Sequence, residues 1–395
     1  MAAVVGRRPL RLIQPVRGVC FVAPEIDRVG GYELATLALS RSLRGRGIPV
    51  LIVTTATRSD ETAEADDLIR IAVRGRHTLL SILPRLLSVL ARERSKYSII
   101  HCPTFSHLSG LAVLAGRILR RPTLLRVATE NDVREFAEGR HWKYRLFFWL
   151  LRGANGVIAP SAAIKSELLR AGFSRERVVC LANAVDISRF TPASLGEKAK
   201  AKEALGLPAE TAVVGTVARL VQRKGIDVLL RAFAVVSDHH QAHLVIVGDG
   251  PLGDELRALA RELKIADSIS WLGFQADAVK WLQTMDVFAF PSRLEGVPNA
   301  VLEAMAVGLP IVATTIGGVT DLLEKGGTGV LIPPDDPDAM AGELDRLLGD
   351  PSIRADLGDR ARKRAVEEFA LSGSIARLVD LYGNLEKGTT PSSVA

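Results

Sequence analysis

The stretch FPSRLEGVPNAVLEAMAVGLPIVATT, residues 290–315, predicts a loop, a short helix and a buried strand in that order. Pro298 suits the first turn of a helix, where its missing N–H costs nothing, and Gly308 followed by leucine and proline is typical of a helix end. Asn299 and Glu303 are four residues apart and therefore share one face of this helix. The free N–H groups of its first turn form a positive site, which suits an oxyanion or a hydroxyl-rich ligand.

Length and pattern place this stretch in the second of two domains. A chain of 395 residues is too long for one ordinary core, and 48% hydrophobic with 24% charged residues is typical of a globular enzyme. Short apolar strands alternate with helices, which implies parallel sheets with crossover helices. A polar, lysine-bearing run after Thr191 leads into the second domain. We therefore expect domains at 1–186 and 187–370, and a C-terminal helix with a flexible tail at 371–395.

The predicted strands are short and strongly apolar. Those of the first domain span 16–22, 49–54, 98–101, 122–128 and 156–159, and those of the second span 212–217, 243–247, 268–272, 287–290 and 329–333. The carboxyl ends of parallel strands face the ligand crevice of such a sheet. Residues that follow the strands are therefore the first candidates for a site.

Composition argues against several classes of protein. Three cysteines without a framework spacing favour a reducing compartment, and no apolar run reaches the length of a membrane-spanning helix. The early arginines are not followed by the apolar core of a secretory signal, so we expect a cytoplasmic protein. The net charge of +7 fits an anionic substrate, an anionic membrane or nucleic acid. Aromatic residues are only 5% of the chain and do not interleave with the basic ones, which argues against nucleic acid.

Three segments of the stretch at residues 290–315 resemble sequences of a known protein family. Glu-Gly-Val-Pro-Asn at 295–299, Leu-Glu-Ala-Met-Ala at 302–306 and Gly-Leu-Pro-Ile-Val-Ala-Thr at 308–314 resemble the donor-site signature of retaining glycosyltransferases of family 4. The resemblance implies an α/β fold of the GT-B type, with two doubly wound Rossmann-like domains that face a cleft. The first domain would bind the acceptor and the second the nucleotide-sugar. A C-terminal helix would cross back onto the first domain.

The resemblance implies different roles for the two glutamates. Glu295 would contact the transferred sugar, and Glu303 would contact the ribose hydroxyls. The other donor-binding residues of this loop would be Gly296, Val297, Pro298 and Asn299. The alternative is a buried amphipathic helix with a solvated Glu303, but such a helix needs neither the Gly-Val-Pro-Asn start nor the Gly-Leu-Pro end.

Further donor contacts are implied by residues that follow other strands of the second domain. The family places a phosphate-binding arginine and lysine at the positions of Arg219 and Lys224, near a strand end where a pyrophosphate could sit. A solvated loop is the alternative for these two cations. Gly250 lies in a run that resembles a nucleotide-side loop, and the strand and turn up to Phe274 resemble the segment whose backbone meets the nucleobase.

Glycines in two loops leave other interpretations open. Gly30 and Gly31 match the family's N-terminal glycine loop, where adjacent glycines let the backbone approach phosphate, although a tight strand-to-helix turn also explains them. The run 248–253 fits the three-glycine pattern of NAD-dependent dehydrogenases. That pattern is expected after a domain's first strand, with an acidic residue after the next one. Here it follows a second strand and no such residue is present, which argues against a dehydrogenase.

The acceptor side of the first domain is less defined. His101 and His107 are expected just beyond a strand end, either as acceptor contacts or as ordinary loop histidines. Many family members carry a histidine near the donor sugar after the strand at 122–128, where this chain reads Thr-Glu-Asn-Asp. The residues available to replace it are Thr129, Glu130, Asn131 and Asp132.

The run HWKYRLFFWLLR at 141–152 mixes aromatic residues with cations. Such a helix could lie on an anionic bilayer, at the inner face of the membrane. A helix that packs over the next strand, 156–159, explains the run at least as well.

The resemblance implies a reaction without metal or cofactor. Departure of the nucleoside diphosphate builds negative charge on the pyrophosphate, and Arg219, Lys224 and helix N-termini could stabilise that charge. The leaving phosphate would take the acceptor's proton, and Glu295 would position the sugar rather than attack it. Asp336 and Asp338 form the paired-aspartate pattern of metal-dependent transferases, but their place in a proline turn before a helix favours capping.

The resemblance implies that the protein is a retaining hexosyltransferase. The donor is expected to be a nucleotide-diphosphate-sugar, with UDP favoured over GDP. The acceptor is expected to be a hydroxyl of a sugar, a lipid-linked glycan or a small molecule, in cell-envelope, exopolysaccharide or glycolipid synthesis. The alternatives are a nucleotide-sugar epimerase of the same fold and a non-catalytic nucleotide-sugar-binding protein.

Overall fold

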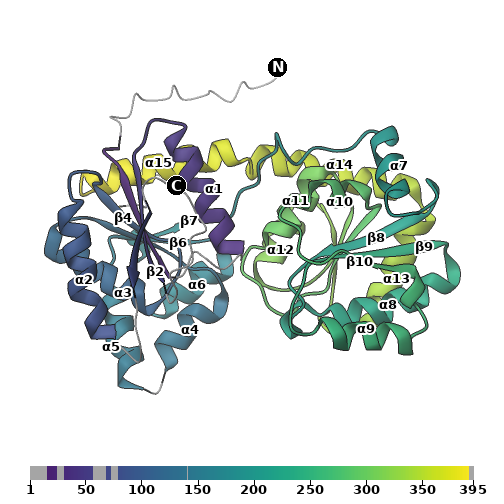
Figure 1. Ribbon diagram of the computed structural model, residues 1–395, viewed down its shortest axis with the longest axis horizontal. Coiled ribbons are helices and arrows are strands. Elements are labelled where there is room, and N and C mark those ends of the chain that lie inside the picture. Colours follow the sequence, from purple (N-terminus) through teal and green to yellow (C-terminus); the bar gives the residue numbers. More distant parts are fainter. Residues whose placement is uncertain (1–15, 25–30, 57–67, 73–78, 140, 391–395) are drawn as a thin grey trace. The chain divides into compact units, whose positions relative to one another are not determined.

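The computed structural model describes residues 16–24, 31–56, 68–72, 79–139 and 141–390 (Figure 1). The chain divides into two compact units. The first comprises Met1–Ala159, Lys165–Cys180 and Ile375–Ala395, and the second comprises Pro160–Ile164 and Leu181–Ser374. Within the described residues, each unit contains a parallel sheet covered by helices. The predicted pair of doubly wound α/β domains is confirmed.

The first unit has a seven-stranded sheet in its described residues, in the order β3-β2-β1-β4-β5-β6-β7. The strands are β1 (Val19–Pro24), β2 (Val50–Ala56), β3 (Leu68–Ala72), β4 (Ile99–Cys102), β5 (Thr123–Arg126), β6 (Gly156–Ala159) and β7 (Val178–Cys180). The helices are α1 (Gly31–Arg44), α2 (Leu79–Arg92), α3 (His107–Leu119), α4 (Glu130–Glu138), α5 (Trp142–Leu151) and α6 (Ala162–Arg170), of which α6 belongs to this unit from Lys165 onward. Strands β4 and β6 are buried along their whole length, which is why they read as continuous apolar runs.

The second unit has a six-stranded sheet in the order β10-β9-β8-β11-β12-β13. The strands are β8 (Ala212–Val217), β9 (Ala242–Val247), β10 (Ile269–Trp271), β11 (Val287–Phe290), β12 (Ile311–Thr314) and β13 (Val330–Ile332). The helices are α7 (Leu195–Glu203), α8 (Ile226–His239), α9 (Gly253–Glu262), α10 (Val279–Thr284), α11 (Asn299–Val307), α12 (Gly317–Leu323), α13 (Pro337–Gly349) and α14 (Pro351–Glu368). Residues 290–315 form the loop after β11, helix α11 and strand β12, as their pattern predicts.

Strand β11 lies between two hydrophobic cores and contributes residues to both. Val287 and Ala289 belong to the core that includes residues of α8 and α13, whereas Phe288 and Phe290 belong to the core that includes α11 and α14. Alternate residues of a strand point to opposite faces of its sheet, so one apolar strand fills both cores. This packing fixes the point at which the loop after Phe290 begins.

The last helix, α15 (Leu371–Glu386), joins the two units in sequence, because its residues from Ile375 onward belong to the first unit. There the Tyr382 hydroxyl and the Nδ1 atom of His101 form a hydrogen bond of 2.6 Å. His101 lies inside β4, is almost fully buried and packs its ring against Phe21. The expectation that His101 follows the strand and faces an acceptor is therefore wrong. The strand extends to Cys102, and burial lowers the pKa of His101 to about 3.

Two acidic residues discussed in the sequence serve as helix caps. Thr129 and Asp132 form a capping box at the start of α4, where the Asp132 carboxylate accepts the backbone N–H of Thr129 at 2.9 Å. The Asp336 carboxylate accepts the backbone N–H of Ala339 at 2.9 Å at the start of α13. The capping role predicted for Asp336 is confirmed. Asp132 is occupied by its own helix, so it is a poor replacement for the family histidine.

Candidate active site

The sheet order of the second unit locates the candidate site. Strands β8 and β11 are neighbours although β9 and β10 lie between them in sequence, so the direction of winding reverses between them. Ligands of open parallel sheets bind beyond the carboxyl ends of the strands at such a reversal. The loop after β8 carries Arg219 and Lys224, and the loop after β11 carries Glu295. The topology therefore brings residues about 70 positions apart to one edge of the sheet.

Lys224 and Glu295 form an ion pair between these two loops. Glu295 is only 7% exposed, and the Ser292 hydroxyl donates a second hydrogen bond of 3.2 Å to its Oε1 atom. The Nζ atom of Lys224 also lies 5.3 Å from the centre of the Phe290 ring, which faces it as a cation–π partner. Burial lowers the pKa of Lys224, and the charge of Glu295 opposes that effect. Both side chains are thus held rigidly at the sheet edge.

Arg293 ties the two loops and a third one together. Its guanidinium makes two hydrogen bonds to the Asp227 carboxylate, at 2.7 and 3.0 Å, and one of 2.5 Å to Asp335. It also donates to the backbone carbonyl of Gln222 at 2.5 Å. The two carboxylates raise the pKa of Arg293 above its already high value. Sequence reasoning missed this residue, because its partners come from loops that are distant in sequence.

Two glycines allow these loops to touch. A Cβ atom on Gly225 would overlap the carbonyl oxygen of Pro291, and the positive φ of +63° at Gly225 also favours glycine. A Cβ atom on Gly318, in the first turn of α12, would overlap the carbonyl oxygen of Gly296. Backbone therefore packs directly on backbone around Glu295, which leaves its loop little freedom to move.

Asn183 supports the start of α11. Its Nδ2 atom donates to the Val297 carbonyl at 2.6 Å and to Oδ1 of Asn299 at 2.9 Å. Pro298 is the N-cap of α11, and the N–H groups of the following turn point out of the helix start. Asn299 is thereby held in place beside the free N–H groups that could receive an anion.

Glu303 lies in the second turn of α11 and is half-buried. Burial raises its pKa to about 7, with the nearby charge of Asp277 acting in the same direction and Arg189 opposing it. No hydrogen bond from a described residue reaches its carboxylate. Such a carboxylate can accept hydrogen bonds from a hydroxyl-bearing ligand.

The remaining donor-side residues of the second unit lie on exposed loops. Arg219 is exposed, and its guanidinium has no hydrogen-bond partner among the described residues. The loop of Arg219 is joined to the loop of Gly250 by a hydrogen bond of 2.9 Å from the Leu220 N–H to the Asp249 carbonyl. Phe274 presents an exposed ring after β10. These positions agree with a ligand-binding edge, and the roles assigned to the residues stay predictions.

The predicted residues of the first unit are less informative. Gly30 lies outside the described residues, and Gly31 is the first residue of α1. Glu130 and Asn131 begin α4, but their side chains also lie outside the described part. His107 is the first residue of α3 and packs among three aromatic rings of α4 and α5, and burial lowers its pKa. The acceptor roles therefore stay predictions for Glu130, Asn131 and His107.

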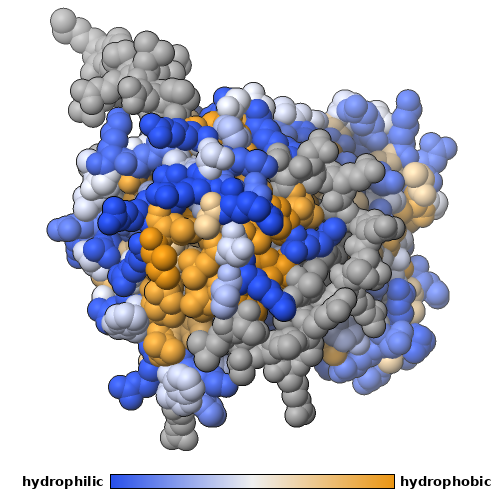
Figure 2. Space-filling view, turned by 60° about the vertical axis from the view of Figure 1, so that its left-hand side comes forward, coloured by the Kyte–Doolittle hydropathy of each residue, from blue (hydrophilic) through white to orange (hydrophobic). Residues whose placement is uncertain are grey.

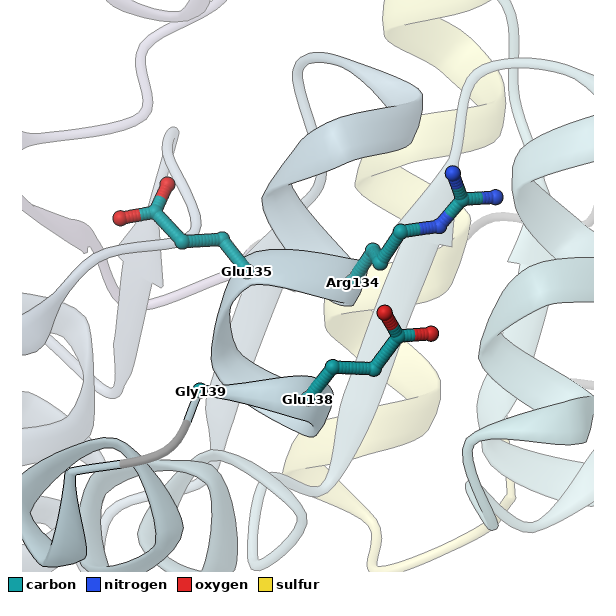
Figure 3. Close-up of a pocket in the computed structure, with 4 residues that line it drawn as sticks. All are labelled: Arg134, Glu135, Glu138 and Gly139. Carbon is teal, nitrogen blue, oxygen red and sulfur yellow. The ribbon is translucent and has the colours of Figure 1, made fainter.

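A surface hollow of about 440 Å³ lies at the C-terminal end of α4 and is lined by Arg134, Glu135, Glu138 and Gly139 (Figure 3). Arg134 and Glu138 point to the same side of the helix, whereas Glu135 points to the other. None of the predicted site residues lines this hollow. We therefore assign the candidate site to the edge of the second sheet.

The described residues contain no group of three or more histidine, cysteine, aspartate or glutamate side chains that could hold a metal ion. No helix among them is long and apolar enough to cross a membrane.

Two family models match the chain. The model described as "Glycosyl transferase 4-like domain" matches residues 30–184, and the model described as "Glycosyl transferases group 1" matches residues 197–364. The second match contains Arg219, Lys224, Glu295 and Glu303.

Relatives and solved structures cover most of the chain. The D-inositol 3-phosphate glycosyltransferase of Corynebacterium urealyticum is 30% identical over 390 residues, which span 90% of this chain and 91% of that protein. The GDP-mannose-dependent monoacylated alpha-(1-6)-phosphatidylinositol monomannoside mannosyltransferase of Corynebacterium glutamicum is 34% identical over 201 residues, about half of each chain. The crystal structure of Anabaena HepE in complex with UDP has a TM-score of 0.78 at 22% identity and covers 92% of this chain and 98% of its own. At this identity, the likeness to HepE concerns the fold.

Proposed function

The chain belongs to the GT-B glycosyltransferases represented by the group 1 and 4-like domains, and we propose that it transfers a hexosyl residue from a nucleotide-diphosphate-sugar to a hydroxyl acceptor with retention of configuration. The observation that carries this proposal is the position of two carboxylates and two cations at one winding reversal. Glu295 is paired with Lys224, whereas the side chains of Glu303 and Arg219 have no hydrogen-bond partner among the described residues.

Arg219 and Lys224 would stabilise the leaving group. Negative charge accumulates on the pyrophosphate as the glycosidic bond breaks, so fixed positive groups near it lower the barrier. Lys224 is held by Glu295 and Phe290, and Arg219 lies on the loop joined to that of Gly250. Lys224 is thus oriented before the charge develops, and the Arg219 guanidinium is unpaired among the described residues and can contact the pyrophosphate, so the proposed reaction needs no metal ion or cofactor.

Glu295 would position the transferred sugar. Its carboxylate is already engaged by Lys224 and by the Ser292 hydroxyl, so a hydrogen-bonding role fits it better than covalent attack. The acceptor would attack on the face from which the nucleotide departs, and the leaving phosphate would take its proton. This sequence of events retains the anomeric configuration without a covalent sugar–enzyme intermediate.

Glu303 would bind the ribose. A ribose presents two neighbouring hydroxyls, and an ionised carboxylate accepts one hydrogen bond from each. The half-buried position on α11 would strengthen these hydrogen bonds, because water competes less there. The exposed ring of Phe274 would lie on the nucleobase side of the same nucleotide.

The relatives suggest classes of donor and acceptor. HepE was crystallised with UDP, whereas the mannosyltransferase of Corynebacterium glutamicum is named for GDP-mannose and a phosphatidylinositol mannoside. The relative from Corynebacterium urealyticum is named for inositol 3-phosphate. We propose a UDP-sugar donor and a polyol or glycolipid acceptor, in the synthesis of an envelope component.

Incubation of the purified protein with labelled UDP-hexoses and GDP-mannose, with and without inositol phosphates or lipid-linked glycans, tests this proposal. A transferase releases nucleoside diphosphate rapidly only when an acceptor is present. Conversion of the sugar without acceptor would identify an epimerase instead. Binding without turnover for any acceptor would support a non-catalytic nucleotide-sugar-binding protein.

The same assay tests independence from metal. A chelator should leave the rate nearly unchanged, because Arg219 and Lys224 occupy the role that a bound cation has in metal-dependent transferases. A rate abolished by chelator and restored by manganese would contradict this part of the proposal. Asp338, beside the cap residue Asp336, would then have to be reconsidered as a ligand.

A further inference from the structure

Three helices of the first unit form one continuous face. Helix α3 contacts both α2 and α5. The contact with α5 is close, since a Cβ atom on Gly110 of α3 would lie 2.8 Å from the Phe147 ring. The side of α5 that packs inward carries Phe147, Leu150 and Leu151. Packing against α3 thus accounts for the inward side of α5 only, and the packing of this helix over the strand at 156–159 stays a prediction.

The outward side of α3 and α5 exposes large apolar residues. Four such side chains are exposed there: Trp142 (62%), Trp149 (60%), Ile118 (57%) and Leu146 (41%). In the described part of the first unit, no other large hydrophobic residue is as exposed. Trp142, Leu146 and Trp149 follow the i, i+4, i+7 spacing of one helix face. Figure 2, in which the left-hand side of Figure 1 comes forward, shows a hydrophobic area among hydrophilic residues.

The charge of this face has a single sign. Helices α2, α3 and α5 contain no aspartate or glutamate, although the chain has 44 acidic residues. Their cations are Arg85, Arg92, Arg117, Lys143 and Arg145. Of the nearby acids, Glu93 is paired with Arg92 and Lys96, and Glu135 of α4 contacts the Tyr144 hydroxyl at 3.5 Å. The face therefore combines exposed tryptophans with an excess of positive charge.

We propose that this α2–α3–α5 face docks on an anionic lipid bilayer. Tryptophan is favoured at the boundary between acyl chains and headgroups, and each lysine or arginine near an anionic surface contributes about 1 kcal/mol. Since no described helix is long and apolar enough to cross a bilayer, this association would be peripheral. A second copy of the chain is a poorer occupant, because two identical faces would bring cations together. The proposal does not depend on the donor site, which lies in the second unit.

Co-sedimentation with vesicles of phosphatidylglycerol or of phosphatidylcholine tests the proposal. The protein should bind the anionic vesicles at low salt and be released at high salt. Lys143→Gln with Arg145→Gln should weaken vesicle partitioning roughly tenfold or more. The double variant Lys200→Gln with Lys363→Gln removes the same charge from exposed sites of the second unit and should retain most binding. Trp142→Ser with Trp149→Ser should also lose binding, whereas Leu195→Ser with Val235→Ser should not.

Three results would overturn the proposal. The first is no binding to anionic vesicles at low salt. The second is an equal loss of vesicle binding in the Lys143→Gln/Arg145→Gln variant and in the Lys200→Gln/Lys363→Gln variant. That result would show that the net charge of the protein, and not this face, causes the binding. The third is a tryptophan variant that changes the oligomeric mass in solution but not vesicle binding, which would identify a contact between copies. Nucleotide binding, measured on the same variants, should be unchanged in every case and keeps this test separate from that of the proposed function.

Discussion

Lys224 and Glu295 meet as an ion pair that joins the loop after β8 to the loop after β11. Both side chains are little exposed, so each charge is balanced mainly by the other. Arg219 is the neighbouring cation whose guanidinium has no hydrogen-bond partner among the described residues. An incoming pyrophosphate would therefore meet an unpaired Arg219 guanidinium, whereas it would compete with the Glu295 carboxylate for Lys224.

The first prediction concerns the stability of this pair. Lys224→Met leaves the Glu295 carboxylate buried with only the Ser292 hydroxyl and the more distant Arg223 nearby, so it should cost roughly 3 kcal/mol of unfolding free energy. Lys325→Met is the matched control, because it breaks an exposed pair with Glu368 and should cost less than about 1 kcal/mol. Thermal unfolding followed by circular dichroism measures both. Equal midpoints for the two variants would show that the Lys224–Glu295 pair is not structural.

The second prediction concerns Arg219. Arg219→Ala should reduce turnover by about 10²–10³, by analogy with the loss of one oxyanion donor, while donor affinity falls less. The reason is that leaving-group charge is larger in the transition state than in the bound donor. Initial rates and donor titrations should be compared with those of Arg261→Ala, an exposed arginine of α9. A loss of affinity as large as the loss of rate would place Arg219 in ground-state binding only.

The third prediction is a pH dependence caused by Glu303. Its pKa of about 7 in the folded protein exceeds the ordinary value of 4.5, so the folded state binds more protons between these values. Stability from this group is therefore full below pH 4.5 and is lost as pH rises through about 7. Glu303→Gln should remove this loss, which amounts to roughly 3 kcal/mol at most. Thermal midpoints at pH 5 and pH 8 measure it, with exposed Glu324→Gln as control; parallel behaviour of all three proteins would contradict the prediction.

The fourth prediction concerns the close packing around Glu295. Gly318→Ala places a methyl group against the Gly296 carbonyl and should shift the loop that carries Glu295. A displacement of about 1 Å can cost roughly 10² in rate. Expressed as free energies, the loss of transition-state stabilisation should therefore exceed the loss of unfolding free energy. Gly342→Ala is the control, because a Cβ atom there meets open space inside helix α13 and should be neutral or stabilising. Unchanged turnover in Gly318→Ala would show that the loop can adjust.

Much of the fold can be predicted from local pattern. Strands β8 and β11 lie at the predicted residues, because both are short and mostly apolar runs bounded by loops. Helix α3, which we did not predict, reads HLSGLAVLAGRIL and is buried along most of its length. Such a helix shows no polar face, so its sequence lacks the period of 3.6 that identifies surface helices. Helix α4 is not predicted from the sequence, because its capping residues, Thr129 to Asp132, resemble a polar loop that follows a strand.

The residues of the candidate site could be predicted from the sequence, but the contacts between their side chains could not. The family resemblance identifies Glu295, Glu303, Arg219 and Lys224, yet nothing in it pairs Lys224 with Glu295. The bonds from Arg293 to Asp335 and from Asn183 to the Val297 carbonyl join residues 42 and 114 positions apart. Only the sheet order brings those segments together, and side-chain pattern carries no information about such pairs.

In the proposed mechanism, Glu303 binds the nucleotide and Glu295 contacts the transferred sugar. Calorimetric titration of UDP, with GDP in parallel, into the wild type and the Glu303→Gln and Glu295→Gln variants measures whether the two roles are separate. We predict that Glu303→Gln weakens nucleotide binding by roughly tenfold or more, because charge-assisted hydrogen bonds to the ribose are lost. Glu295→Gln should bind the nucleotide as tightly as the wild type or more tightly, since Lys224 is then released, while its turnover falls. Equal losses of nucleotide affinity in the two variants, or an unchanged affinity in Glu303→Gln, would contradict the account.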